Sequence, residues 1–349
     1  MSTFTVKVRR IAVHPHPNAD LLELAQVDEY RIVVGKGQFR TGDLVVYIPE
    51  QAIVPAPLLE EMGLTGRLAG PETNRVKAIR LRGELSQGLA YRPRPWPDDW
   101  CEGVDVAESL GIVKWEPPIP IEMAGQVEPF PSGADGFART YTDIENFQSF
   151  PHVLVEGQPV EVTEKLHGTC AITGILDGVR VASSKGIAVR GLVIKEDANN
   201  VYWRAALRER LFEALQAYLD RQGGTRALLF GEILGVQDLR YGLSNGRIAY
   251  RAFDLYVEGP DGPRFLDVTP FAEFCRSYEV PRVPVLYSGP WDREAVRPLL
   301  TGASTLASHI REGVVIRPLV EQYDPSVGRL ILKWISPDYL TRKGGTEFN

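Results

Sequence analysis

Short runs of alternating apolar and polar residues fill the first part of the chain. The runs at 30–34, 43–48 and 76–82 are separated by Gly, Asp and Pro residues. Alternation with a period of two is typical of β-strands that bury one face, and Gly, Asp and Pro are typical of the turns between them. Short strands at this spacing predict a small β-barrel over residues 1–95.

Proline, glycine and acidic residues dominate the stretch 93–136. Such a composition is typical of a connector rather than of a packed element. We therefore expect a linker at 96–120 between the barrel and a second domain.

Longer elements are predicted in the second half of the chain. Apolar residues recur at helical spacing across 198–222, with charged residues between them, which predicts a surface helix that covers a sheet. The stretch 268–277 predicts a second, shorter helix. The runs 171–176 and 179–184 flank Asp177-Gly178, a preferred two-residue turn, and therefore predict a β-hairpin.

The composition limits the classes of protein to consider. With 349 residues, the chain has room for two hydrophobic cores. The formal net charge is −6, but affinity for nucleic acid depends on where cations cluster. Cys101, Cys170 and Cys275 lie far apart, so neither a disulfide framework nor a zinc site is predicted. No apolar run reaches the length of a membrane span, and we expect a soluble protein in the reducing cytoplasm.

A lysine at the end of an apolar strand is the first candidate for chemistry. Lys165 ends the alternating run that begins at Glu161, and Gly168 then turns the chain. Alone, Lys165 would be interpreted as an edge charge, because a lysine amine ordinarily titrates with a pKa of about 10.4 and is a nucleophile only where its surroundings lower that pKa. Later apolar segments also carry charges beside glycines, as a sheet that lines a pocket would. These charges are Lys185, Glu232, Glu312 and Lys333.

A set of motifs follows in a fixed order along the second half of the chain. In this order they resemble the motif series of the covalent nucleotidyltransferases, which comprise RNA ligases, DNA ligases and mRNA capping enzymes. His167 stands where DNA ligases and capping enzymes usually have Asp, which is similar to the Deinococcus-type branch of nick-sealing RNA ligases. The motifs are Lys165-Leu-His-Gly168, Ser184-Lys-Gly186, Phe230-Gly-Glu232, Phe253-Asp254, Glu312-Gly-Val-Val-Ile-Arg317 and Leu332-Lys333.

The predicted barrel has a resemblance of its own. The segments 14–22, 35–43 and 81–89 resemble the tRNA-binding OB-fold modules attached to some aminoacyl-tRNA synthetases. Cations cluster in one stretch of it and would form a strip that tracks a phosphate backbone. The alternative is that they are solvated strand edges, since Lys and Arg also protect edges from aggregation. The cations are Arg75, Lys77, Arg80, Arg82, Arg92 and Arg94, of which Lys77, Arg80 and Arg82 are the candidate nucleic-acid contacts.

Together, the two resemblances imply the fold class α+β. An N-terminal OB-fold β-barrel would precede a nucleotidyltransferase (ligase adenylation) domain at 121–349, with antiparallel sheets flanked by helices. The segment 140–148 resembles the lead-in helix that precedes the lysine motif in RNA ligases. The hairpin that follows this motif would place Lys165 and Lys185 on neighbouring strands.

The resemblance also implies roles for individual residues. Lys165 would form a covalent adduct with AMP from ATP, and Lys333 would contact the α-phosphate. Glu232 would hold the ribose hydroxyls or a metal-bound water, and Glu164 is a contact to adenine in relatives. The last motif lacks the Lys-x-Lys that many relatives carry, so the second cation is absent or comes from elsewhere, with Arg329 and Lys343 as candidates.

Other roles follow from residue type and position. Burying the Glu312 carboxylate would be costly unless it binds a metal ion or a lysine, so Glu312 is a candidate ligand of Mg²⁺ or Mn²⁺, and the resemblance implies Glu232 as a second candidate. Lys185 and Arg190 are placed to meet the terminal phosphate of ATP or RNA. We expect His167 to orient the substrate rather than act as a general base, because the proton of the amine can leave to solvent.

Adenine should stack on one aromatic ring of the segment 250–254. Strand alternation predicts Tyr250 and Asp254 on one face and Phe253 on the other. Tyr250 is preferred by its spacing, and core packing is the alternative interpretation of Phe253. Both residues are therefore candidate nucleotide contacts.

These features predict an ATP-dependent RNA ligase that joins 3′-OH and 5′-phosphate ends and uses Mg²⁺ or Mn²⁺. Only a short tail follows Lys333, so we expect no C-terminal OB domain of the kind that DNA ligases and capping enzymes use. The N-terminal OB domain would then engage a nicked, RNA-containing duplex, and no membrane or protein partner is expected. A DNA ligase or capping-type enzyme is the nearer alternative, and a non-catalytic RNA-binding OB protein is an alternative of another class.

Overall fold

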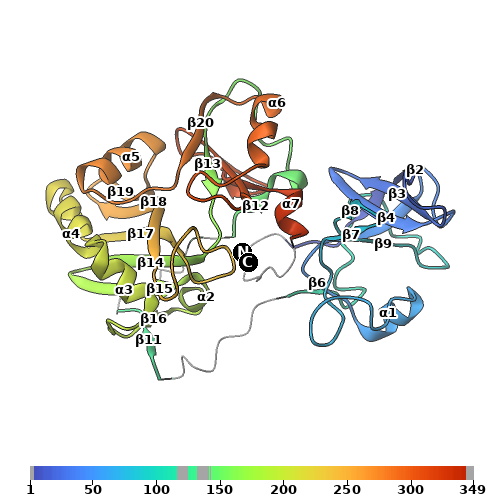
Figure 1. The fold of residues 1–349 in the computed structure, drawn as a ribbon, viewed down its shortest axis with the longest axis horizontal. Helices are drawn as coiled ribbons and strands as arrows, with labels where there is room; N and C mark the ends of the chain where they lie inside the picture. The colour runs from blue at the N-terminus through green and yellow to red at the C-terminus, as the bar shows by residue number, and fades with distance from the viewer. Residues whose placement is uncertain (1–3, 116–124, 132–140, 142, 343–349) are drawn as a thin grey trace. The chain divides into compact units, whose positions relative to one another are not determined.

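The computed structural model describes residues 4–115, 125–131, 141 and 143–342, and the chain divides into two compact units (Figure 1). One unit comprises Ser2–Pro117 with Leu340–Arg342, and the other comprises Pro118–Tyr339. The predicted end of the linker at residue 120 lies outside the described residues. No helix of the described part is both long and apolar enough to cross a membrane.

The N-terminal unit is built from short antiparallel strands whose alternate side chains are buried together, such as Val46 with Ile48 and Ile32 with Val34. One sheet contains β1 (Val8–Arg10), β5 (Leu44–Ile48) and β9 (Leu89–Tyr91), and another contains β2 (Ala12–Pro15), β3 (Leu22–Val27) and β4 (Tyr30–Gly35). The remaining elements are β6 (Ala52–Ile53), α1 (Ala56–Glu61), β7 (Ile79–Leu81), β8 (Glu84–Ser86) and β10 (Val113–Lys114).

A seven-stranded antiparallel sheet forms one layer of the second unit. It contains the predicted hairpin, whose turn residues Asp177 and Gly178 have φ values of 51° and 85°, as a two-residue turn requires. In spatial order the strands are β11 (Val127–Pro129), β16 (Leu192–Ile194), β15 (Val179–Ser184), β14 (Thr169–Leu176), β17 (Arg226–Leu234), β18 (Ala249–Gly259) and β19 (Gly262–Phe265).

A five-stranded sheet forms the second layer. Its central strands are antiparallel, and its edge strand β12 is parallel to its neighbour. In spatial order the strands are β12 (Glu145–Asn146), β24 (Leu332–Ile335), β21 (Gly313–Pro318), β13 (Pro159–Lys165) and β20 (Val285–Pro290). Beside it, β22 (Tyr323–Asp324) pairs with β23 (Gly328–Arg329).

Helices cover one face of the seven-stranded sheet, as the helical periodicity predicts (Figure 1). The predicted helix at 198–222 is two helices, because Arg210 adopts the left-handed conformation with φ 53° and breaks it. The predicted lead-in helix at 140–148 is wrong where it is described, since β12 and a 3₁₀ turn, Phe147–Ser149, occupy its second half. The α-helices of this unit are α2 (Lys185–Ala188), α3 (Val201–Arg208), α4 (Leu211–Gln222), α5 (Val268–Ser277), α6 (Arg293–Val296) and α7 (Pro337–Leu340).

The other face of the seven-stranded sheet packs on the five-stranded sheet. Ile172 and Phe230 from the first share a hydrophobic cluster with Val315 of β21 and with Ile331, the residue before β24. The helix-covered face has a separate cluster that includes Trp203 from α3. Residues of the first face therefore lie between the two sheets.

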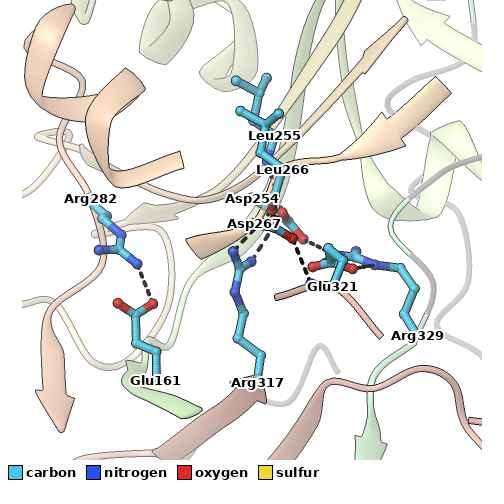
Figure 2. A network of polar contacts seen from close by, with 9 residues as sticks. All are labelled: Glu161, Asp254, Leu255, Leu266, Asp267, Arg282, Arg317, Glu321 and Arg329. Atoms are coloured by element: carbon cyan, nitrogen blue, oxygen red, sulfur yellow. Dashed lines mark hydrogen bonds and ion pairs between the residues drawn. The ribbon is translucent and has the colours of Figure 1, made fainter. Parts of the chain in front are cut away.

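Buried ion pairs join the two sheets in this layer (Figure 2). Asp254 of β18, which is fully buried, accepts hydrogen bonds from Arg317 Nη1 at 3.2 Å and Arg329 Nη2 at 2.9 Å. Arg329 Nη2 also lies 2.8 Å from Glu321 Oε1. A second pair, between Glu161 of β13 and Arg282, lies nearby, and Glu161 is the cross-strand neighbour of Arg317. The charges alternate in sign, so no buried charge in this network lacks a partner of opposite sign.

We expect Asp254→Asn to destabilise the chain by about 3 kcal/mol or more, because the buried Arg317 loses its counter-charge and Arg329 keeps only Glu321. Asp177→Asn is the matched control, since Asp177 forms its pair with Arg226 at the exposed surface, where such pairs contribute little. Urea unfolding of both variants measures the difference. Equal stability of the two variants would contradict a structural role for the buried network.

Candidate active site

Lys165 and Glu312 form the centre of the candidate site. Lys165 is the last residue of β13 and lies opposite Gly313, the first residue of β21. Its Nζ is 2.5 Å from Glu312 Oε1, and the side chains are 18% and 1% exposed. The second oxygen, Glu312 Oε2, is buried and has no hydrogen-bond partner among the described residues. A buried carboxylate oxygen without a donor is suited to accept a cation.

A glycine is required beside Glu312. Gly313 has φ 155°, and a Cβ there would overlap the backbone carbonyl of Trp334 on β24. Only glycine lets β21 approach β24 so closely. The same pairing places Lys333 in the site, because Val315 lies opposite both Thr163 and Lys333, and Lys333 therefore shares the face of Lys165.

Glu232 comes to the site from the other sheet. It lies on β17 opposite Cys170 of β14, and Gly168 lies close against its side chain. Burial raises the pKa of Glu232 from 4.5 to about 8, and the Glu312 charge adds to the rise, whereas the Lys165 charge opposes it. The candidate site therefore combines Glu232 of the seven-stranded sheet with Glu312 and the amines of Lys165 and Lys333 at the five-stranded sheet.

Lys185 also reaches this region, although by a different route from the one predicted. Lys165 and Lys185 are not on neighbouring strands, because the chain leaves the five-stranded sheet after Lys165 and enters the seven-stranded sheet at Thr169. Lys185 begins α2, and its Nζ donates to Asp143. Both amines act on the pKa of Glu232, so they lie around the same carboxylate.

Both ring nitrogens and the backbone N–H of His167 form hydrogen bonds. Its Nε2 is 2.7 Å from Asp238 Oδ1, its Nδ1 is 2.7 Å from the Tyr339 hydroxyl, and its backbone N–H donates to the Tyr241 hydroxyl at 2.7 Å. A carboxylate only accepts hydrogen bonds, so Nε2 carries the proton toward Asp238. Sequence reasoning missed Asp238, Tyr241 and Tyr339, since they lie outside the recognised motifs and have no distinguishing pattern.

The predicted arrangement of the aromatic residues in β18 is wrong. Tyr250 is 1% exposed and packs on the helix-covered face, with its ring over Gly231. A β-bulge at Phe230–Gly231 leaves Phe253 without a cross-strand partner and shifts the alternation. Phe253 and Asp254 therefore both face the five-stranded sheet. The ring centroids of Phe253 and Tyr141 are 5.0 Å apart. The preference for Tyr250 over Phe253 as the stacking ring does not fit this placement.

Glu164 points away from Lys165. Strand alternation places the two side chains on opposite faces, and Glu164 Oε2 accepts from Thr305 N at 2.9 Å and Thr305 Oγ1 at 2.6 Å. Its Oε1 is buried without a hydrogen-bond partner in the described part of the chain. Arg190 is exposed on the turn after α2.

The remaining predicted cations have varied surroundings. Arg329 is bound by Asp254 and Glu321, so it is not available as a second phosphate-binding cation, and Lys343 lies outside the described residues. In the N-terminal unit, Arg75 stacks on Trp115 and Arg92 donates to the Leu44 carbonyl, so these members of the predicted strip serve packing. Arg80 and Arg82 are exposed on the β7–β8 hairpin, Lys77 is half-buried before it, and Arg80 donates to Thr341.

Glu232 makes the stability of the chain depend on pH. Because the folded chain favours the protonated carboxyl, its contribution to the unfolding free energy is fully present below pH 4.5 and is lost as pH rises through about 8. Glu232→Gln is neutral at every pH and should lack this loss. Urea unfolding of wild type and variant across this range, without added metal, should show a difference that changes with pH. A constant difference would contradict the raised pKa.

Comparison with known proteins identifies the family. The model of the RNA ligase family matches residues 158–335, and a model of an OB-fold domain matches residues 5–93. These matches confirm the predicted α+β architecture of an OB-fold domain followed by a ligase domain. No curated protein sequence matches the chain.

Several solved structures resemble the whole chain. Naegleria gruberi RNA ligase with PPi is 28% identical, with a TM-score of 0.76 over 96% of this chain and 97% of that one. A point mutant of the same enzyme with AMP and Mn is 27% identical, with a TM-score of 0.76 over 96% and 98% of the chains. Another mutant, with ATP and Mn, is 27% identical, with a TM-score of 0.75 over 97% and 98%. Because the family model covers half of its length, the chain belongs to the RNA ligase family.

Proposed function

We propose that this RNA ligase uses ATP to join a 3′-OH end to a 5′-phosphate end through a Lys165–AMP adduct. The main support for this proposal is the 2.5 Å contact between Lys165 Nζ and Oε1 of the buried Glu312. Lys333 lies on the same face of the five-stranded sheet as Lys165. Related Naegleria structures contain ATP, PPi or AMP, which are the nucleotide substrate, the leaving group of the first step and the leaving group of the last step of such a reaction.

The proposed reaction has three steps. The Lys165 amine attacks the α-phosphorus of ATP, a P–N bond forms, and the bond to pyrophosphate breaks. An oxygen of the RNA 5′-phosphate then attacks the adenylate phosphorus and releases Lys165. Finally, the 3′-OH attacks the activated 5′-phosphate and displaces AMP. Each step needs alignment and charge neutralisation more than proton transfer, so charges fixed by the two sheets are suited to all three.

The donor set fits a divalent cation bound jointly with a nucleotide. Glu312 Oε2 is buried without a hydrogen-bond partner in the described chain, and Glu232 lies across from it. The described residues contain no cluster of three or more His, Cys, Asp or Glu that could hold a metal alone. Mg²⁺ and Mn²⁺ are commonly held by one or two carboxylates and substrate phosphates, so Glu312 and Glu232 would hold such an ion. When bound, it would neutralise the phosphate oxygens.

Other residues would bind the nucleotide and RNA. Lys333 shares the nucleophile's face and would contact the α-phosphate, and Lys185 with the exposed Arg190 would meet the terminal phosphate of ATP or RNA. Phe253 replaces Tyr250 as our candidate for stacking on adenine, because it is half-buried on the site's side of β18. Glu164 stays a proposed adenine contact from the opposite face of β13, since its Oε1 is buried and has no hydrogen-bond donor among the described residues.

We propose a nicked, RNA-containing duplex as the substrate, with the OB domain engaging the duplex and the ligase domain acting on its ends. The exposed Arg80 and Arg82, with Lys77 before them, would contact phosphates of the duplex. Cytoplasmic activity on such substrates is consistent with Cys101, Cys170 and Cys275, which are all free thiols.

Incubation with radiolabelled ATP should label the wild-type chain covalently, and Lys165→Ala should abolish the label. The matched control is Lys195→Ala, since Lys195 is an exposed lysine that donates to the Gly125 carbonyl. The control should label at the wild-type rate. An unlabelled wild-type chain would contradict the proposal and favour a non-catalytic RNA-binding protein, whereas labelling by GTP instead of ATP would favour a capping-type enzyme.

Nicks that differ only in the sugar at the 3′-OH end should separate an RNA ligase from a DNA ligase. We expect sealing of the RNA-terminated nick to be about tenfold faster or more. DNA lacks the 2′-OH, so the polar groups of an RNA ligase that would bind this hydroxyl have no partner on a DNA end. Gel assays of ligation with each strand in turn as RNA or DNA measure this preference. Faster sealing of all-DNA nicks would show that the proposed substrate is wrong.

A further inference from the structure

A loop outside the recognised motifs forms hydrogen bonds with the turn that follows Lys165, the proposed nucleophile. We name residues 237–241, between β17 and β18, the positioning loop, and residues 166–168 the nucleophile turn. Gln237 donates to the Gly168 carbonyl, Asp238 bonds the His167 ring at 2.7 Å, and the Tyr241 hydroxyl accepts the His167 backbone N–H at 2.7 Å. Three side chains of one short segment therefore satisfy backbone and ring groups of the turn.

The loop has a defined shape of its own. A Cβ at Gly235 would lie 2.6 Å from the Arg247 carbonyl oxygen, so the two ends of the excursion meet closely. Tyr241 has φ 51°, a left-handed conformation that costs energy for a bulky residue. Such a conformation persists only where its surroundings hold it, and Tyr241 is buried in a cluster with Leu166 and Val283. The apolar residue of the nucleophile turn thus packs against the loop that binds its polar groups.

The loop is connected to Lys165 through two routes. Along the chain, the nucleophile turn begins at the residue after Lys165, and its conformation sets how β13 ends. Through space, His167 Nδ1 lies 4.0 Å from Glu312 Oε2, and the other oxygen of that carboxylate holds the Lys165 amine. Phe253 packs against the same cluster as Tyr241 and Leu166. The loop therefore contacts His167, which lies beside the carboxylate that binds Lys165, and it shares a hydrophobic cluster with Phe253, the candidate ring for stacking on adenine.

We propose that Asp238 and Tyr241 are positioning residues that align Lys165 with the α-phosphate of ATP. This inference rests on the proposed function. Among the described residues, the positioning loop bonds to the nucleophile turn, so its effect on Lys165 would pass through that turn and Glu312. Adenylyl transfer needs the amine in line with the departing pyrophosphate, and small displacements from that line reduce the rate strongly. Loosening the loop should reduce the rate of adduct formation more than the affinity for ATP.

Tyr241→Phe tests this role because it removes only the oxygen that accepts the His167 N–H. Tyr256→Phe is the matched control, since the Tyr256 hydroxyl donates to Glu258 at 2.7 Å in the second half of β18, whereas the positioning loop precedes the first residue of that strand. Single-turnover labelling with radioactive ATP should show Tyr241→Phe slowed about tenfold to hundredfold, with the KM for ATP changed by less than about threefold. Tyr256→Phe should label at the wild-type rate.

Hydrogen exchange provides a readout that does not depend on activity. Amides of the nucleophile turn should exchange faster in Tyr241→Phe than in wild type or Tyr256→Phe, because the His167 N–H has lost its acceptor. If Tyr241→Phe does not fold, Asp238→Asn takes its place and should show the same loss of rate with an unchanged KM.

The outcomes separate this inference from the proposed function. A wild-type chain that forms no adduct overturns the proposed function, and the exchange measurement still decides whether the loop holds the turn. Unchanged exchange in the variant overturns the positioning role whatever the activity. A wild-type labelling rate in a folded variant, or a loss that appears entirely in KM, also overturns it.

Discussion

The buried contact between Lys165 and Glu312 is the constraint on which the rest of the ligase domain depends. Removing an amine and a carboxylate from water is costly, and their attraction repays the cost only when the geometry is good and the remaining polar atoms have a use. Strand register supplies that geometry, since it places Lys165 opposite Gly313 and fixes Glu312 one residue earlier. The second carboxylate oxygen has no hydrogen-bond donor among the described residues, which suits the cation that the proposed reaction needs.

A site made from two sheets also requires that the sheets stay at a fixed separation. Glu232 comes from the seven-stranded sheet, whereas Lys165, Glu312 and Lys333 come from the five-stranded sheet or its edge. The Asp254 network joins the same two sheets with buried charges, which bind at defined angles and distances rather than by non-directional packing (Figure 2). Hydrophobic contacts hold the layers together, and the ion pairs restrict how they can shift.

The raised pKa of Glu232 has a functional meaning in this arrangement. Burial and the Glu312 charge favour its protonated form, which lowers the repulsion between the two carboxyl groups. An incoming cation would reverse that balance and make ionisation favourable. The site is thus stable without a cation and yet suited to bind one together with a nucleotide, as the proposed adenylyl transfer requires.

Sequence alone determined the local structure and the identity of the charged groups. The hairpin turn at Asp177, the strand ending at Lys165 and the pairing of Glu312 with a glycine could be predicted, because alternation and turn chemistry depend on adjacent residues. Only the tertiary structure decided which sheet each strand joins, where the bulge at Phe253 reverses the alternation, and that the positioning loop meets the nucleophile turn. The physical reason is distance along the chain: the hydrogen bonds from His167 to Asp238 and Tyr241 span 71 and 74 residues, and no local sequence pattern encodes such contacts.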